Sequence, residues 1–251
     1  MRSGGPMAFA AVVLGSYLLG SLPFGFMAAR IRGVDILKVG SGATGATNVL
    51  RTLGPAYAVP VLLLDAGKGA LSAYLGLRYL GMGTWGALIA GAAAVSGHNW
   101  SVFLKFKGGK GVAASAGVGL VAFPTVVVVA VTVFVLTVAI TRYVSLGSLL
   151  GAWSALITTF AAGYGHEQKV PVLVLVILIT LQHRSNIGRL ISGNERKLGE
   201  KVDLGSQPQA KEGTPSLTAA EGHNPRSEAD SPEGTGAGQG TRNHTEKGDT
   251  A

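Results

Sequence analysis

Residues 111–141 read GVAASAGVGLVAFPTVVVVAVTVFVLTVAIT, a run of 31 residues that carries no charged side chain. A helix needs about 20 apolar residues to cross a bilayer, so this run is too long for one span and short for two. Pro124 lies near its middle, where a proline interrupts a helix. The run therefore suggests two consecutive membrane helices, over roughly 111–123 and 124–141, and the charges of the loops decide between one helix and two.

Five further apolar segments flank this run, at 7–29, 55–80, 84–100, 144–163 and 170–183. With seven helices and the N-terminus outside, the outer side holds only Arg2, Arg78 and Lys169, as the positive-inside rule favours. A single helix over 111–141 would instead move Arg142 outside. The inner side holds Arg30, Arg32, Lys38, Arg51, Lys105, Lys107, Lys110, Arg142, Arg184, Arg189, Arg196 and Lys197. We therefore expect an all-α, polytopic integral membrane protein with about seven transmembrane helices, its N-terminus outside and its C-terminus inside.

The charges divide the chain into two unlike parts. Only 14% of the 251 residues are charged, against about 25% in an average soluble domain. Residues 1–198 hold 16 Lys and Arg but four acids, whereas residues 199–251 hold nine acids and five Lys and Arg, and no Phe, Trp or Tyr. The second part cannot bury enough apolar area to offset chain entropy. The sequence predicts a membrane domain over 1–198 and a disordered, polar and acidic tail over 199–251.

Several classes of site are excluded by what the chain lacks. The absence of Cys rules out a Cys-ligated metal and a thiol nucleophile. The four acids of residues 1–198 are too few and scattered for a two-metal phosphoryl-transfer site, and Asp65 is expected to pair with Lys68 inside the second membrane helix. Neither His98 nor His183 has an Asp five positions later, and no nucleotide-binding fingerprint is present. The long apolar runs between basic residues also argue against nucleic acid. What remains is an anion site beside apolar helices, suited to a lipid phosphate or a phosphorylated small molecule.

The first candidate segment is GSGATGATNVLR, residues 40–51. Its glycines free the backbone to turn several N–H groups toward one point, and Arg51 adds a planar cationic fork. Ser41, Thr47 and Asn48 add further donors, so the segment suits a phosphate. A flexible turn with Thr47 or Asn48 capping a helix explains the same residues equally well.

The second candidate segment runs from Gly97 to Gly111 and ends in Gly-Gly-Lys-Gly before an apolar helix. This arrangement brings backbone N–H groups, a helix N-terminus and the Lys110 ammonium together, as anion sites do. It is not a P-loop, because the spacing differs and no Ser or Thr follows Lys110. An interfacial loop that meets anionic lipid accounts for Lys105 and Lys107, but less well for a lysine between glycines.

The third candidate segment runs from His183 to Glu195. On one continuous helix His183 and Asn186 would share a face, and a histidine titrates near neutral pH, so His183 is the candidate base. The alternative is a capped helix end in which His183 satisfies carbonyl groups and Arg189 pairs with Glu195. Taken alone, His183 fits this alternative better than a catalytic role.

Together the three segments resemble those of the bacterial acyl-phosphate:glycerol-3-phosphate acyltransferases, the PlsY type. The matching residues, which cover roughly 10–198, are Ser41, Gly42, Gly45, Ala46, Thr47, Asn48 and Arg51, then Gly97, His98, Phe103, Phe106, Gly108, Gly109, Lys110 and Gly111, then His183, Asn186, Arg189, Leu190, Gly193 and Glu195. One position departs from the pattern, because Ala43 stands where the family has Asn and one donor is therefore missing.

The resemblance implies an enzyme of the bacterial cell (inner) membrane whose active site faces the cytoplasm. It implies transfer of a fatty acyl group from acyl phosphate to the 1-hydroxyl of glycerol 3-phosphate, the first acylation step of phospholipid biosynthesis. The expected partners are these two substrates and membrane lipid, with no nucleic acid, metal or cofactor. The implied catalytic residues are Ser41, Arg51, Lys110, His183 and Asn186. The implied substrate- and phosphate-binding residues are Ser41, Gly42, Thr47, Asn48, Arg51, His98, Gly108, Gly109, Lys110, Gly111, His183 and Asn186.

Three alternatives stay open at the level of sequence. Either His183 or a phosphate oxygen of the substrate takes the hydroxyl proton. A transporter or binding protein for phosphate or a phosphorylated solute would also use basic, Gly-rich segments, although it predicts a polar path through several helices that the chain does not offer. A third possibility is a related enzyme with another donor, such as acyl-CoA.

Overall fold

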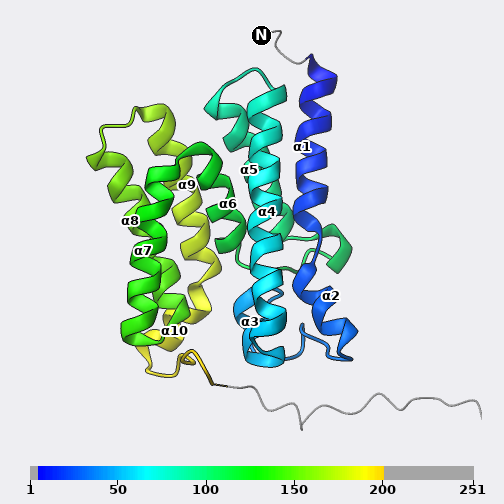
Figure 1. The fold of residues 1–251 in the computed structure, drawn as a ribbon, viewed down its shortest axis with the longest axis vertical. Helices are drawn as coiled ribbons and strands as arrows, with labels where there is room; N and C mark the ends of the chain where they lie inside the picture. The colour runs from blue at the N-terminus through cyan, green and yellow to red at the C-terminus, as the bar shows by residue number, and fades with distance from the viewer. Residues whose placement is uncertain (1–4, 201–251) are drawn as a thin grey trace, which may run out of the picture. The chain divides into compact units, whose positions relative to one another are not determined.

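A computed structural model describes residues 5–200, and most of these residues are helical (Figure 1). Apart from Gly199 and Glu200, the predicted tail lies outside the described residues. The elements are α1 (Pro6–Ser21), α2 (Phe24–Ile31), α3 (Ala46–Leu53), α4 (Pro55–Tyr79), α5 (Thr84–Asn99), the short 3-10 helix η1 (Val102–Leu104), α6 (Val112–Ala122), α7 (Pro124–Thr141), α8 (Val144–Ala161), α9 (His166–Gln182) and α10 (Arg184–Ile191).

All seven predicted apolar segments are helical, and the run 111–141 is indeed divided at Pro124 into α6 and α7. Within residues 5–200, four stretches are long and apolar enough to cross a membrane: Pro6–Ile31, Pro55–Tyr79, Pro124–Thr141 and Val144–Ala161. The pair formed by α9 and α10 makes a fifth if a bend of 60° is allowed within one span. The all-helical fold is therefore confirmed, whereas the count of seven spans stays a prediction.

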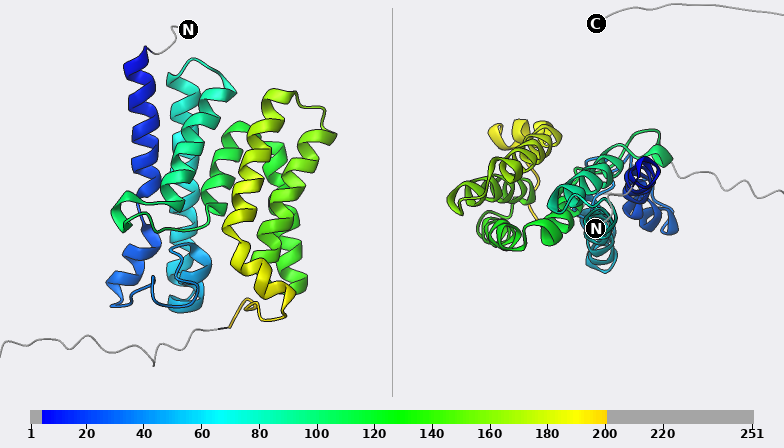
Figure 2. Two further views of the ribbon diagram at one scale, coloured as in Figure 1. Left: turned by 180° about the vertical axis from the view of Figure 1, so that it is seen from behind. Right: turned by 90° about the horizontal axis from the view of Figure 1, so that it is seen from above.

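The long helices run side by side in two groups, one of α1, α4, α5 and α6 and one of α7, α8 and α9 (Figures 1 and 2). In the first group α4 packs against α5 and α6, and α1 packs against α5. Its buried core is small-residue rich and consists of Ala73, Ala87, Val95, Ala114 and Val118. The core of the second group consists of Phe123, Val126, Leu156, Val172 and Val176.

Helices of the first group approach one another closely because glycines lie at the contacts. A Cβ at Gly20 of α1 would clash with the backbone of Ala94 in α5, and a Cβ at Gly69 of α4 would clash with the backbone of Ala114 in α6. Small residues at such contacts let helix backbones come together where lipid supplies no hydrophobic force between helices. The C-terminal half of α5 is thereby fixed against α1, and the N-terminal end of α6 is fixed against α4.

The predicted first span, 7–29, is broken between α1 and α2 at Leu22 and Pro23. Proline has no N–H group and ends the helix at this point, which leaves carbonyl groups without their usual partners. Two side chains from other segments supply them: Ser101 Oγ donates to Ser21 O at 2.6 Å, and Lys68 Nζ donates to Leu22 O at 2.9 Å. These two hydrogen bonds stabilise the break and connect the end of α1 to α4 and to the segment after α5.

Candidate active site

The three candidate segments, far apart in sequence, contact one another in the structure. The first and second are joined by a hydrogen bond from Thr44 N to Gly108 O of 3.3 Å. The second and third are joined by Lys110, whose Nζ donates to Asn186 Oδ1. The predicted convergence of these segments is thus present.

A cavity of about 150 Å³ lies between the first and third segments. Arg51 of α3 reaches across it, with Nη2 donating to Arg196 O at 2.9 Å. Arg51 is 8% exposed, and its Nε is buried without a hydrogen-bond partner. The lining residues are Gly40, Ser41, Arg51, Arg189, Asn194, Glu195 and Arg196. A small cavity whose walls include Arg51, Arg189 and Arg196 suits a phosphate group.

Asn48 shapes the loop of the first segment. Its buried Nδ2 donates to Val39 O at 3.0 Å and to Ala43 O at 2.9 Å, and its Oδ1 accepts from Ser41 N at 3.1 Å. The amide therefore uses its hydrogen bonds within the protein and fixes the backbone around Ser41, which is exposed at the cavity. Thr47 lies half-buried in the first turn of α3.

His98 lies beneath the glycine turn of the second segment and does not line the cavity. Gly109 N donates to His98 O at 3.0 Å, and a Cβ at Gly109 would clash with Nε2 of the His98 ring. A Cβ at Gly108 would likewise clash with His98 O. On its other side the His98 ring places Nδ1 at 3.3 Å from Asp65, and the predicted ion pair of Asp65 with Lys68 is present at 2.8 Å.

Lys110 follows the two glycines and is half-buried. Burial lowers the pKa of its ammonium to about 8; Arg189 and Arg51 add to the lowering, and Glu195 opposes it. A lysine with this pKa is still mostly charged at neutral pH and lies in a weakly solvated place. Both properties favour a strong interaction with phosphate.

His183 marks a break between two helices, which differs from the continuous helix assumed from the sequence. α9 ends at Gln182 and α10 begins at Arg184, with a bend of 60° between them. His183 is 2% exposed, and its Nδ1 lies 2.8 Å from Ile179 O. A carbonyl oxygen only accepts, so Nδ1 carries the proton in the neutral ring and Nε2 keeps a lone pair. This tautomer leaves Nε2 able to accept a proton.

Glu195 organises the third segment, and of its contacts the sequence indicated only the pair with Arg189. Its Oε1 accepts from Asn186 Nδ2 at 2.7 Å and from Ser145 Oγ at 2.9 Å, and its Oε2 accepts from Arg189 Nε at 2.8 Å. Burial raises the pKa of this carboxyl, but the three hydrogen bonds outweigh burial and hold the pKa below its usual range. The pair with Arg189, given above as an alternative interpretation, is confirmed.

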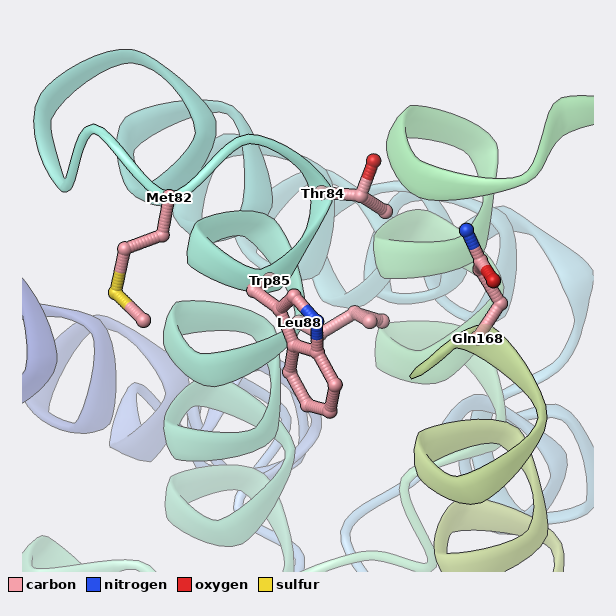
Figure 3. Close-up of a pocket in the computed structure, with 5 residues that line it drawn as sticks. All are labelled: Met82, Thr84, Trp85, Leu88 and Gln168. Atoms are coloured by element: carbon pink, nitrogen blue, oxygen red, sulfur yellow. The ribbon is translucent and has the colours of Figure 1, made fainter. Parts of the chain in front are cut away.

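A second cavity, of about 210 Å³, lies near the start of α5 and the start of α9, at the opposite end of these helices from α10 (Figures 1 and 3). Its lining residues are Met82, Thr84, Trp85, Leu88 and Gln168. None of the predicted site residues is among them. Within residues 5–200, no three His, Asp or Glu side chains come together as a metal site.

Comparison with known proteins identifies a family. Residues 10–193 match the family described as glycerol-3-phosphate acyltransferase. The chain is 44% identical to the glycerol-3-phosphate acyltransferase of Symbiobacterium thermophilum over 192 residues, which cover 76% of this chain and 96% of that one. It is 47% identical to glycerol-3-phosphate acyltransferase 1 of Deinococcus radiodurans over 190 residues, which cover 74% and 94% of the two chains.

Two solved structures share this fold. One is the glycerol 3-phosphate form of PlsY, an integral membrane glycerol 3-phosphate acyltransferase, with a TM-score of 0.73 and 41% identity. The other is the lysophosphatidic acid form of PlsY, with a TM-score of 0.70 and 40% identity. Each similarity covers 76% of this chain and 96% of the solved chain.

Proposed function

Because the chain belongs to the glycerol-3-phosphate acyltransferase family, we propose that it transfers a fatty acyl group from acyl phosphate to the 1-hydroxyl of glycerol 3-phosphate. The products are lysophosphatidic acid and phosphate. The single observation that supports this proposal best is the junction of the three segments, where Lys110 contacts Asn186 beside a cavity lined by Arg51 and Ser41. It is a site for phosphate that also holds a buried histidine, His183.

Both substrates carry a phosphate, so the reaction needs two anion subsites. Ser41 and Arg51 serve one of them from the walls of the cavity. Lys110 serves the other from the glycine turn. Thr47 and Asn48 orient these phosphate-binding residues. Asn48 does so by accepting a hydrogen bond from Ser41 N, which holds the Ser41 backbone in place.

The chemical step needs little beyond orientation, because acyl phosphate is a mixed anhydride with a good leaving group. The 1-hydroxyl oxygen attacks the acyl carbonyl carbon, the bond from that carbon to the phosphate oxygen breaks, and phosphate leaves with the electron pair. The hydroxyl proton passes to Nε2 of His183 or to a phosphate oxygen. Lys110 and Arg51 stabilise the negative charge that develops. No covalent acyl-enzyme is formed.

Asn186 connects the candidate base to the candidate phosphate ligand. It follows His183 by one turn of α10, donates to Glu195 through Nδ2 and accepts from Lys110 through Oδ1. Its amide is therefore held in one orientation, with no freedom to flip without breaking both contacts. In this arrangement Asn186 sets the distance between the Lys110 ammonium and the His183 ring.

The membrane topology is part of the same proposal. Seven helices with the N-terminus outside put the three segments on the cytoplasmic face of a bacterial inner membrane, where glycerol 3-phosphate is dissolved. The positive-inside rule supports this orientation. The large apolar side chains exposed on the long helices, among them Leu63, Val128, Ile140 and Ile157, support contact with lipid.

The test is an assay of the purified protein in detergent micelles with glycerol 3-phosphate and, separately, acyl phosphate, acyl-CoA and the thioester of acyl carrier protein. Mass spectrometry measures lysophosphatidic acid. Product from acyl phosphate alone is the expected result. Product from a thioester donor instead would mean that the enzyme uses another acyl donor. Binding of glycerol 3-phosphate without product from any donor would favour a transporter or binding protein.

A further inference from the structure

Three polar side chains form a buried cluster that the proposed chemistry does not use. Asp65 Oδ1 in α4 lies 2.8 Å from Lys68 Nζ and 3.3 Å from His98 Nδ1. All three residues are at most 6% exposed. Charges within a membrane helix are costly and are usually retained for a function. Lys68 alone would balance the charge of Asp65, so the presence of His98 as a third member requires its own explanation.

One end of this cluster lies directly beneath the glycine turn. The His98 ring faces Gly109 so closely that a Cβ there would clash with Nε2, and the His98 carbonyl accepts from Gly109 N at 3.0 Å. Lys110 is the next residue, and its ammonium contacts Asn186. The position of the His98 ring therefore limits how closely the turn that carries Lys110 can approach α5.

The other end of the cluster is anchored at the break in the first span. Lys68 Nζ donates to Leu22 O at 2.9 Å and lies 5.4 Å from the centre of the Phe24 ring. Asp65 is thus held by a lysine that is itself fixed at two further points. A carboxylate held in this way can orient an imidazole ring, in the manner of partners behind a metal-bound or catalytic histidine.

We propose that Asp65 and His98 are positioning residues for acyl transfer: Asp65 fixes the His98 ring, and the ring holds the Gly108–Gly109 turn so that the Lys110 ammonium meets the substrate phosphate. The inference rests on the proposed function. Neither residue contacts the substrate. Both act by fixing the position of the Lys110 ammonium.

The test replaces the ion pair by two neutral amides, Asp65→Asn with Lys68→Gln, so that no unpaired charge is left buried. A second variant, His98→Gln, keeps the ion pair and removes the ring. The matched control is Ser72→Ala in the same helix, which removes a hydroxyl that is buried without a hydrogen-bond partner. The expected fall in kcat/KM for glycerol 3-phosphate is about 10- to 100-fold per folded molecule in both test variants, and less than about twofold in the control.

The pH profile separates positioning from general loss of structure. Lys110 is faced by Arg51 of α3, by His183, and by Arg189 and Glu195 of the third segment, and burial among them lowers its pKa to about 8. If the turn is released, the ammonium becomes more solvated and the alkaline fall of kcat/KM moves to higher pH. Partial unfolding lowers the amount of active enzyme but leaves this fall at the same pH.

The outcomes are distinct. A loss of kcat/KM together with an upward shift of the alkaline limb supports the inference. Activity of the test variants within twofold of Ser72→Ala, or a loss with an unshifted limb, overturns it. If the neutral pair variant does not fold, His98→Gln decides alone. Failure of the wild-type chain to acylate glycerol 3-phosphate from acyl phosphate would instead refute the proposed function.

Discussion

Asn186 donates to Glu195 through Nδ2 at 2.7 Å, and this bond directs its Oδ1 to the ammonium of Lys110. The relationship joins the loop after α10 to the glycine turn before α6. It also explains why an acidic residue lies in the proposed anion site. The carboxylate orients a neutral amide, and that amide, instead of a second charge, contacts the lysine.

Replacing Glu195 by Gln tests this arrangement. The amide oxygen can still accept from Asn186 and Ser145, but the new NH₂ group would face Arg189 Nε, so two donors meet. We expect a loss of about 1–3 kcal/mol in the free energy of unfolding, together with a fall in kcat/KM. Thermal unfolding in detergent, followed by tryptophan fluorescence, and steady-state kinetics measure the two effects.

Lys38→Gln is the matched control for this variant. It breaks an exposed pair with Asp35 at 3.4 Å and is expected to change stability by less than about 0.5 kcal/mol. Equal losses in the free energy of unfolding for the two variants would show that the contacts of Glu195 stabilise the fold no more than an exposed ion pair does. The sign of the pH effect is a further check. A carboxyl with a lowered pKa stabilises the fold above its usual pKa of 4.5, and this contribution is lost as the pH falls below that value.

The pKa of Lys110 predicts where kcat/KM falls on the alkaline side of its pH profile. Its ammonium must be charged to bind phosphate, and its pKa is about 8, so kcat/KM of the wild type falls as the pH rises through about 8. Bound phosphate favours the charged form, which places the corresponding fall of kcat at higher pH. In Lys110→Arg the side chain stays charged, and the fall near pH 8 disappears, although the rate is lower because the contact with Asn186 changes.

Lys107→Arg provides the comparison for the pH experiment, because Lys107 is an exposed residue of the same segment. Its profile should match that of the wild type. Rates measured from pH 6 to 10, with the stability of the protein checked at each pH, give both limbs. An alkaline limb that persists unchanged in Lys110→Arg would assign it to another group.

The sequence predicts the helices well because each one depends on a local property, a run of apolar residues that ends at Pro, Gly or charge. Convergence of the three segments is also predictable, since it follows from the loop charges. The break at Leu22 and Pro23 is not, although Pro23 is visible, because its stability depends on Ser101 and Lys68 from other segments. Whether a helix stops or continues through a proline is decided by such distant partners.

The roles of single side chains at the site are less predictable than the site itself. Asn48 resembles a phosphate donor in the sequence, but its amide holds the backbone of its own loop. The contact of Glu195 with Ser145 joins residues 50 positions apart, and no local spacing indicates it. His98 belongs to a matching motif and yet faces Asp65 beneath the turn instead of the cavity.

Gly109→Ala is expected to reduce kcat/KM by about 10- to 100-fold, because the new methyl group overlaps Nε2 of His98 and Asp65 restrains the ring from moving away. The turn must therefore shift and carry Lys110 with it. Gly67→Ala in α4 is the control, since a Cβ there meets nothing within 4 Å and alanine favours a helix. Kinetics of the two variants at equal folded concentration, measured by size-exclusion chromatography, make the comparison. Equal activity would mean that the turn tolerates a side chain.

His183→Gln distinguishes the two candidates for the base. If Nε2 of His183 takes the hydroxyl proton, the variant should lose about 10²- to 10⁴-fold in kcat at every pH, because glutamine cannot accept a proton. If a substrate phosphate takes the proton and His183 only positions glycerol 3-phosphate, the variant should keep much of kcat and show a raised KM. His166→Gln is the control, because His166 begins α9 at the opposite end of that helix. A His183→Gln enzyme with the rate and pH profile of the wild type would exclude His183 as the base and leave a phosphate oxygen of the substrate in that role.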